Sequence, residues 1–286
     1  MALTINTNLS SLIVQRNLEV ATAALNKSIE RMTTGYKINS AADDAAGYAV
    51  ATKMNTKLSS IDVCQDNVAM GSSLLSTLSS NYDLISTHLQ RIRDLTEEAG
   101  NGTYGGDSLE AIAAEITARW DEIDRIAASS EFNGINLMTG GGAISIRCGV
   151  GTTTNDTITL DSTIFATATG EGLQGTSPTT KTNFIKAIKK ESGAPTIEAA
   201  LGQIDIALAE VTKRQTNIGA YQNRLDSASE ALEVQYSNVT SSLSTIKDAD
   251  VAAESSAYIK AQILQQASAT LLSTANQSPS IALNLI

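Results

Sequence analysis

Apolar residues recur every seven positions along two long stretches of the chain. In the first stretch two such series are offset by three residues; they are Met54, Ile61, Val68, Leu75, Tyr82, Leu89 and Thr96, and Cys64, Gly71, Leu78, Ile85, Ile92 and Ala99. This spacing and offset form the a/d seam of a coiled-coil helix. The pattern predicts a helix from about residue 45 to about residue 99, capped by Asp43 or Asp44 and ended by Gly100 or Gly102.

The same pattern predicts two further helices. One begins at Asp107, which can form a capping box with Glu110, and it ends before Asn133-Gly134; its seam is Leu109, Ala113, Ile116, Trp120, Ile123 and Ala127. The other carries eight heptad positions, which are Ile197, Ile204, Val211, Ile218, Leu225, Leu232, Val239 and Ile246. Its partner series contains Gln215, Gln222 and Ser229, and such polar seam residues can fix register at a cost in stability. Strict seven-residue repeats also predict left-handed supercoiling.

The segment between these helices has a different composition. Residues 131–194 are rich in glycine and threonine, and they contain short alternating runs that predict strands at 143–150 and 156–160. Residues 165–182 are expected to form a surface loop. The predicted fold class is therefore mainly α, a long antiparallel coiled-coil bundle of paired N- and C-terminal regions, with a small β-hairpin region in the middle.

Both ends of the chain are amphipathic. Leu18, Leu25, Ile29 and Met32 follow helical spacing before a helix stop at Gly35, and residues 261–286 contain no charged residue. The apolar face of that tail includes Ile263, Leu264, Leu271 and Leu272. A monomer gains little by exposing such faces, so we expect these eight apolar residues to be polymerisation seams that bury against other copies of the chain.

Charge and residue usage exclude several functions. The net charge is −10, from 30 acidic and 20 basic residues, which makes nucleic acid a poor partner. No apolar run reaches the roughly 18 residues that a membrane span needs. The first residues lack the basic and apolar segments of a cleaved secretory signal.

Candidate chemistry is equally sparse. One histidine and two cysteines cannot form a His/Cys metal site, and no nucleotide-binding or metalloprotease motif is present. His88 has no nucleophile or carboxylate pattern around it, so we expect no catalytic, cofactor or metal site. Cys64 lies on the seam and is expected to behave as a small buried hydrophobe, whereas the state of Cys148 stays open.

Two segments resemble the signatures of bacterial flagellin. The stretch from Met32 to Gly47, MTTGYKINSAADDAAG, resembles the N-terminal signature, and the stretch from Ile246 to Gln277 resembles the C-terminal one. The resemblance implies a discontinuous inner coiled-coil domain of residues 1–42 and 248–286. It also implies a helical rod domain of residues 43–247, with a β-hairpin segment at about 131–194 and no large outer domain.

The resemblance also implies a function. Flagellins are structural proteins, not enzymes, that self-polymerise into the helical filament used for motility. They are exported unfolded through the flagellar type III secretion channel and end up outside the cell. The implied partners are further copies of the chain, a flagellar secretion chaperone, and the filament cap and hook-junction proteins.

A receptor site is implied as well. Residues 89–95, LQRIRDL, resemble the segment recognised by vertebrate Toll-like receptor 5, and the matching contacts are Arg91, Leu95 and Glu115. The spacing of Arg91, Leu95 and Glu98 places them on a face beside the seam, so Leu95 is expected outside the core. Packing of this face against a neighbouring subunit in the filament is the favoured interpretation, and the two can hold together.

Three alternatives stay open. A hook–filament junction protein shares related termini but forms only a short ring, so polymerisation of the purified chain into micrometre fibres separates the two. A filament-borne protease needs a metal-binding histidine pair that the sequence lacks. A secreted coiled-coil effector needs no match at both termini.

Overall fold

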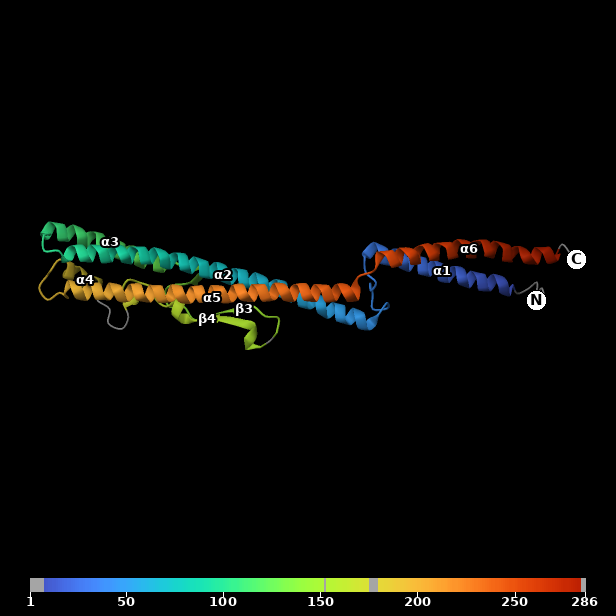
Figure 1. Cartoon of the computed structure of the whole chain (residues 1–286), viewed down its shortest axis with the longest axis horizontal. Helices are drawn as coiled ribbons and strands as arrows, with labels where there is room; N and C mark the ends of the chain where they lie inside the picture. The colour runs from blue at the N-terminus through green and yellow to red at the C-terminus, as the bar shows by residue number, and fades with distance from the viewer. Residues whose placement is uncertain (1–7, 152, 175–179, 284–286) are drawn as a thin grey trace. The chain divides into compact units, whose positions relative to one another are not determined.

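The computed structural model describes residues 8–151, 153–174 and 180–283, with side chains described up to residue 277 in the last helix. Its helices are α1 (Leu9–Thr34), α2 (Ala45–Gly100), α3 (Gly106–Ser129), α4 (Lys181–Ile188), α5 (Ile197–Lys247) and α6 (Val251–Leu283) (Figure 1). Short 3-10 turns occupy Thr154–Asp156, Ser162–Phe165 and Gly172–Gln174. The prediction of a mainly α fold with a small hairpin is confirmed.

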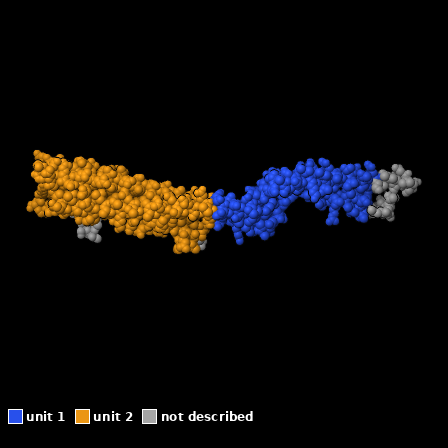
Figure 2. Space-filling view, in the orientation of Figure 1, with its two compact units in different colours: residues 1–59, 236–286 blue, residues 60–235 orange. Residues whose placement is uncertain are grey.

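The chain forms two compact units, coloured separately in Figure 2. The terminal unit comprises residues 1–59 and 236–286, and the central unit comprises residues 60–235. The domain limits expected at residues 42 and 248 stay a prediction, and they fall where α1 gives way to α2 and α5 to α6. Residues 1–7 and 284–286 of the expected inner domain lie outside the described residues.

The predicted heptad seams form the core of the central unit. On α2 the residues that lose all solvent contact include Ile61, Leu75, Leu78, Tyr82, Ile85, Ile92, Thr96 and Ala99. All six predicted seam residues of α3 are buried, as are Ile204, Val211, Ile218, Leu225 and Leu232 on α5. The polar seam residue Gln215 is only half-buried, because its amide reaches the rim and donates to Asp83 Oδ1 at 2.6 Å.

Two local predictions are wrong. No side chain caps α3, whose N-cap is Gly105, so Asp107 lies inside the first turn, where its charge favours the helix dipole. Leu95 is 2% exposed and belongs to the core, not to a surface beside it. The reason is that ion pairs place α2 beside both α3 and α5, through Arg91–Glu115 and Arg93–Asp205. A helix flanked on two sides buries a wider arc than a two-helix seam.

Two antiparallel hairpins follow α3. Strands β1 (Glu131–Phe132) and β2 (Ile135–Asn136) are joined by Asn133 and Gly134, whose positive φ angles of 50° and 78° suit a tight hairpin turn. Strands β3 (Ile144–Arg147) and β4 (Thr157–Leu160) pair with Ile146 opposite Ile158. The seam glycine Gly71 makes room for this hairpin, because a methyl group there would collide with Ile146.

The segment after β4 is not the surface loop that was expected. Phe165, Ala168, Leu173 and Gln174 are buried, and helix α4 then begins at Lys181. On α4, Phe184 lies 5.2 Å from Trp120 between ring centroids, so the segment covers α3. Residues 175–179 of the expected loop lie outside the described residues.

One buried charge joins this segment to two helices. The guanidinium of Arg214 on α5 is 5% exposed, and its Nη1 donates to Tyr82 Oη at 3.2 Å and to the Ala166 carbonyl at 2.8 Å. Its Nε donates to Glu210 Oε1 at 3.1 Å. Burial raises the pKa of Tyr82, whose hydroxyl stays protonated and donates to the Ile164 carbonyl at 3.0 Å. Heptad periodicity does not reveal this network, because Arg214 is not a heptad position.

Two classes of feature are not found in the described residues. Among the helices searched, none combines the length and hydropathy that crossing a bilayer requires. No group of three or more His, Cys, Asp or Glu side chains in that part of the chain could hold a metal ion.

Replacing Arg214 by Met should destabilise the central unit. The substitution keeps most of the apolar volume but leaves the Tyr82 hydroxyl and the Ala166 carbonyl without their donor, at a cost of about 1–3 kcal/mol. Urea unfolding of the monomer measures this change. Lys213→Met is the matched control, because Lys213 is exposed and only 3.6 Å from Glu210 in a surface ion pair. Equal stability of the two variants would contradict a structural role for Arg214.

Candidate assembly surfaces of the terminal helices

Helices α1 and α6 lie side by side and antiparallel. Near the start of α1, Asn8 Nδ2 donates to the Ala275 carbonyl at 2.7 Å and Ser11 Oγ to Asn276 Oδ1 at 2.7 Å. Farther along, Thr22 Oγ1 accepts from Gln265 Nε2 at 3.1 Å, and Arg31 lies 3.7 Å from Glu254. The contacts therefore run the whole described length of α1.

The seam between these two helices is built from small residues. The residues buried there are Ala21 and Ser28 on α1, and Ala261 and Ser268 on α6. Alanine and serine allow two helix backbones to come close, and many α-carbon pairs of α1 and α6 lie within 8 Å. Sequence reasoning missed this seam, because small and polar side chains give no apolar periodicity.

Most bulky apolar side chains of the pair are exposed and point away from its seam. Val20 is 63% exposed on α1, and Ile263 and Leu271 are 60% and 58% exposed on α6. Ile29, Met32 and Leu264 are also exposed, whereas Leu18, Leu25 and Leu272 are half-buried along the pair. The eight predicted seam residues thus divide into three that support the pair and five that are open to a further partner. Their role in polymerisation stays a prediction.

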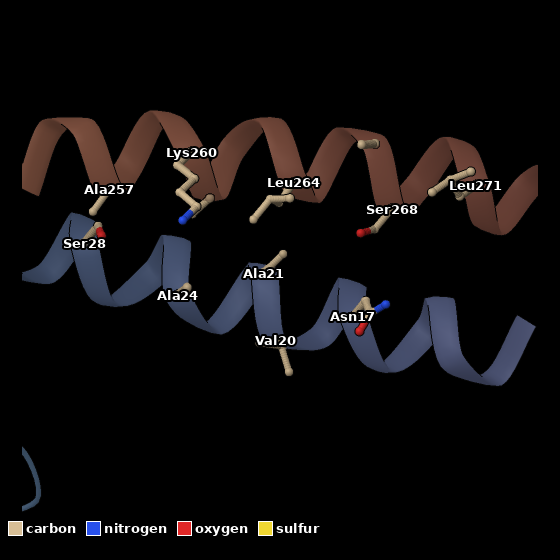
Figure 3. A pocket seen from close by; sticks show the side chains of 12 residues that line it. Asn17, Val20, Ala21, Ala24, Ser28, Ala257, Lys260, Leu264, Ser268 and Leu271 are labelled. Atoms are coloured by element: carbon tan, nitrogen blue, oxygen red, sulfur yellow. The ribbon is translucent and has the colours of Figure 1, made fainter. Parts of the chain in front are cut away.

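A shallow groove runs along the pair. Its volume is about 610 Å³, and α1 lines it with residues from Asn17 to Ser28 while α6 lines it from Ala257 to Leu271. Figure 3 shows Leu264 and the small side chains of Ala21, Ser28 and Ser268 between the two helices. Two helices alone bury one face each, so this apolar surface suits a third and fourth helix from outside the pair.

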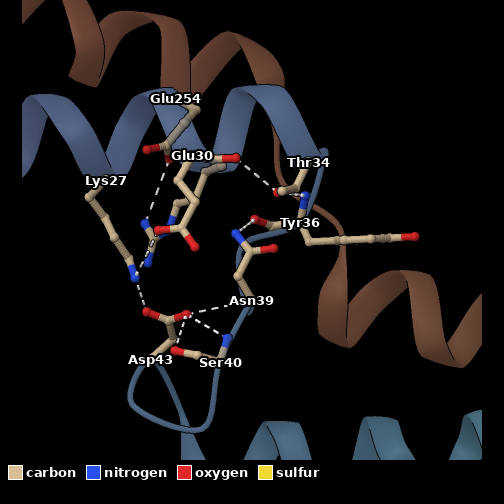
Figure 4. Close-up of polar contacts among 9 residues, drawn as sticks. Lys27, Glu30, Thr34, Tyr36, Asn39, Ser40, Asp43 and Glu254 are labelled. Atoms are coloured by element: carbon tan, nitrogen blue, oxygen red, sulfur yellow. Dashed lines mark hydrogen bonds and ion pairs between the residues drawn. The ribbon is translucent and has the colours of Figure 1, made fainter.

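The turn between α1 and α2 is fixed by polar contacts (Figure 4). Gly35 ends α1 in the left-handed conformation with φ of 75°, and its carbonyl accepts from Ala249 N at 2.9 Å. Lys37 N donates to the Lys247 carbonyl at 2.8 Å, and Tyr36 and Asp248 form an antiparallel bridge. The connection between α1 and α2 is therefore hydrogen-bonded to the connection between α5 and α6.

Asp43 anchors the other side of that turn. Its Oδ2 accepts from Asn39 N at 3.1 Å and from Ser40 N at 2.9 Å, while Oδ1 accepts from Lys27 Nζ on α1. The Lys27 ammonium, followed by the Ser40 amide, holds the pKa of Asp43 far below its ordinary value. The neighbouring Asp44 caps α2 by accepting from Ala46 N and Gly47 N at 3.0 Å.

The second predicted site is only partly assembled. Arg91 Nε on α2 donates to Glu115 Oε1 on α3 at 3.1 Å, and Arg119 Nη2 reaches the same oxygen at 2.9 Å. Hydrogen bonds from Arg119 and then Arg91 lower the pKa of Glu115. Arg91 and Glu115 therefore share an exposed surface, whereas Leu95 is buried beneath it.

Acid should release the turn that Asp43 anchors. Because its pKa is lowered in the folded chain, its contribution to stability is fully present above the unfolded value of 3.8 and is lost progressively as the pH falls below it. We expect the amide protons of Asn39 and Ser40 to be protected from hydrogen exchange at pH about 5 and to lose protection progressively below about pH 3.8. Asp43→Asn should expose them at every pH. Unchanged protection in that variant would contradict the role of the carboxylate.

Comparison with known proteins gives a consistent picture. Residues 5–143 match the family described as the bacterial flagellin N-terminal helical region, and residues 201–286 match the bacterial flagellin C-terminal helical region. A flagellar filament core protein of Brachyspira hyodysenteriae is 33% identical, with 99% of each chain covered. A flagellin of Xenorhabdus nematophila is 34% identical, with 100% of each chain covered.

The fold has a counterpart among solved structures. A chain described as a putative flagellar hook-associated protein from Vibrio parahaemolyticus has a TM-score of 0.61 and 19% sequence identity, covering 72% of this chain and 100% of its own. This likeness concerns the fold alone.

Proposed function

Because the chain belongs to the bacterial flagellin family and is a subunit of the flagellar filament, we propose that it polymerises through the outward faces of α1 and α6. One observation carries the proposal. The pair uses small residues for its internal seam and leaves Val20, Ile263 and Leu271 mostly exposed. Such an apolar surface on a monomer is a candidate interface, and identical copies offer the same helices to one another.

The magnitudes are consistent with assembly. Complete burial of one Leu- or Ile-sized side chain gives about 1.5–3 kcal/mol. Association costs about 4–15 kcal/mol in translational and rotational freedom, so a single such residue cannot drive it. A subunit that buries the exposed side chains of both helices against several neighbours exceeds this cost. Polymerisation therefore depends on the sum of many apolar contacts, and a charge placed among them should prevent it.

Ile263→Asp should abolish polymerisation without unfolding the monomer. Ile263 is 60% exposed in the isolated chain, so the substitution removes little internal packing, but it places a charge on the outward face. Fibre formation by the purified protein, observed by negative-stain microscopy and light scattering, measures the effect. Circular dichroism of the monomer should be the same as in the unmodified chain.

Ile263→Val is the matched control, because it keeps an apolar side chain and should leave fibres intact. Normal fibres from Ile263→Asp would remove this face from the interface. Fibre formation by the unmodified chain also distinguishes a filament subunit from a hook–filament junction protein, since the latter forms only a short ring.

We also propose the route and the partners that the family resemblance implies. The chain is exported unfolded through the flagellar type III secretion channel and adds to a filament outside the cell, between the hook-junction and cap proteins. Before export, a cytoplasmic chaperone covers the C-terminal apolar segment. The exposed apolar residues of α6, among them Ile259, Ile263 and Leu271, support this proposal, because an unshielded monomer would associate prematurely.

We propose a host receptor contact at the ion pair of Arg91 and Glu115. Toll-like receptor 5 would bind the exposed surface of α2 and α3 on the monomer. The support is that both side chains lie together there, at 46% and 37% exposure. Leu95 is not part of the proposed contact surface, because it is buried in the core. The same surface is a candidate for packing against a neighbouring subunit in the filament.

Arg91→Ala should weaken activation of the receptor by the monomer while leaving the fold intact. The loss of one charge-assisted contact at an interface corresponds to roughly a tenfold higher half-effective concentration. A receptor reporter assay measures it. Arg125→Ala is the matched control, since Arg125 forms a similar exposed ion pair with Glu122 on α3.

Leu95 can be tested separately. Leu95→Ala leaves a cavity in the core and should cost about 2–5 kcal/mol of unfolding free energy, measured by urea unfolding.

For the receptor contact, the contradicting outcome is that Arg91→Ala activates the receptor as well as Arg125→Ala does.

A further inference from the structure

The two cysteines of the chain lie at one junction of the central unit, where the hairpin of β3 and β4 meets α2. Cys64 is on the α2 seam and is 4% exposed. One turn farther on, Asn67 Nδ2 donates to the Arg147 carbonyl at 3.3 Å, so α2 contacts the residue just before Cys148. A further turn along, Gly71 receives Ile146. Two successive positions of α2 thus contact the end of β3, and Cys64 lies one turn before them.

The alternation of β3 turns Ile146 toward α2, and Cys148 follows two residues later. Successive side chains of a strand face opposite sides, and Ile146 faces Gly71 while Arg147 is exposed. Just past the end of β3, Cys148 N and Gly149 N both donate to the Asp156 carbonyl at 2.9 Å, so the ladder ends in a bulge. Cys148 is half-buried at this bulge. Both thiols are free in the structure.

Electrostatic coupling between the thiols agrees with this placement. Burial raises the pKa of Cys64, and the nearby Cys148 thiol raises it further, although Arg147 opposes both. Burial likewise raises the pKa of Cys148. Both groups are thus mainly protonated at neutral pH, and they react slowly without a dedicated oxidant.

From this juxtaposition we infer that Cys64 and Cys148 form an intramolecular disulfide that staples the β3–β4 hairpin to α2 under oxidising conditions. The oxidant is a small-molecule disulfide. The Cys148 thiolate, being the more accessible, attacks one sulfur of the reagent and releases one thiol. The Cys64 thiolate then attacks Cys148 Sγ, forms the protein disulfide and releases the second thiol. Two protein thiols are oxidised, and one reagent disulfide is reduced to two thiols.

The staple changes how the hairpin is held. In the reduced chain the hairpin meets α2 through the Asn67 hydrogen bond and the Ile146 packing. A covalent link between residues 64 and 148 closes a long loop and restricts the unfolded chain, which raises stability. Hairpin and helix then unfold together instead of separating locally.

The test treats the purified full-length monomer with oxidised glutathione. Free thiols should fall from two to none, the mass should drop by about 2 Da, and peptide mapping without reductant should join the Cys64 and Cys148 peptides. The midpoint of urea unfolding should rise on oxidation and return with dithiothreitol. The Cys64→Ala, Cys148→Ser double variant should show no such shift.

Single variants test the order of attack. Cys64→Ala should stop at a glutathione adduct on Cys148, whereas Cys148→Ser should stay reduced because Cys64 is buried. Unmodified chain that keeps two free thiols, retains a stable glutathione adduct, or forms disulfide-linked dimers would overturn the inference. An internal disulfide without a shift in the urea midpoint would contradict the claim that the bond stabilises the attachment of the hairpin to α2. These outcomes do not depend on whether the chain polymerises.

Discussion

The size of the residues between α1 and α6 sets the behaviour of the terminal unit. Each helix of the pair has one face toward its partner and one face outward. The inner faces carry buried alanine and serine, and the outer faces carry exposed leucine, isoleucine and valine. The small seam allows close backbones and cross-helix hydrogen bonds such as the one from Gln265 to Thr22. It releases little hydrophobic free energy, because few large side chains leave water. The pair is therefore well defined but leaves large apolar side chains exposed, which the proposed contacts with further copies would bury.

In the central unit, the large apolar side chains are buried by helices of the same unit. There α2 is covered by α3 and α5, so large residues such as Leu75 and Ile85 lose all solvent contact. A buried Arg214 then satisfies the carbonyl of Ala166 and the Tyr82 hydroxyl, which fixes how the irregular segment after β4 crosses the helices. Burial of such a charge favours a single arrangement, since any shift leaves polar groups unpaired. The two units thus differ in how much of their stability comes from within the chain.

Sequence periodicity predicted the parts of the fold in which large apolar residues repeat. The seams of α2, α3 and α5 could be predicted because Ile, Leu and Val at heptad spacing rarely occur outside the buried face of a helix. The α1–α6 seam could not, since Ala21, Ser28 and Ser268 are residue types that are equally common on a surface.

Tertiary contacts decided the elements that periodicity missed. Leu95 was misplaced because a heptad describes one seam, whereas α2 has two neighbours. Arg214 and α4 were missed because no local pattern records the contacts that fix them. Ile263 and Leu271 are exposed in the chain, and their role as polymerisation seams stays a prediction.

Because the α1–α6 seam buries little apolar surface, the turns that precede and follow it must fix the orientation of the two helices. Hydrophobic burial between α1 and α6 is small, so the connections of the terminal unit are held by directional contacts instead. Asp43 joins Lys27 to the Asn39 and Ser40 amides, and the strand-like bridge of Tyr36 with Asp248 ties the second connection to the first. Such polar contacts set geometry without covering apolar surface, so they orient both helices and leave their outer faces free. Replacing these contacts by a larger apolar core would stabilise the monomer, but it would use the side chains that the proposed contacts between subunits require.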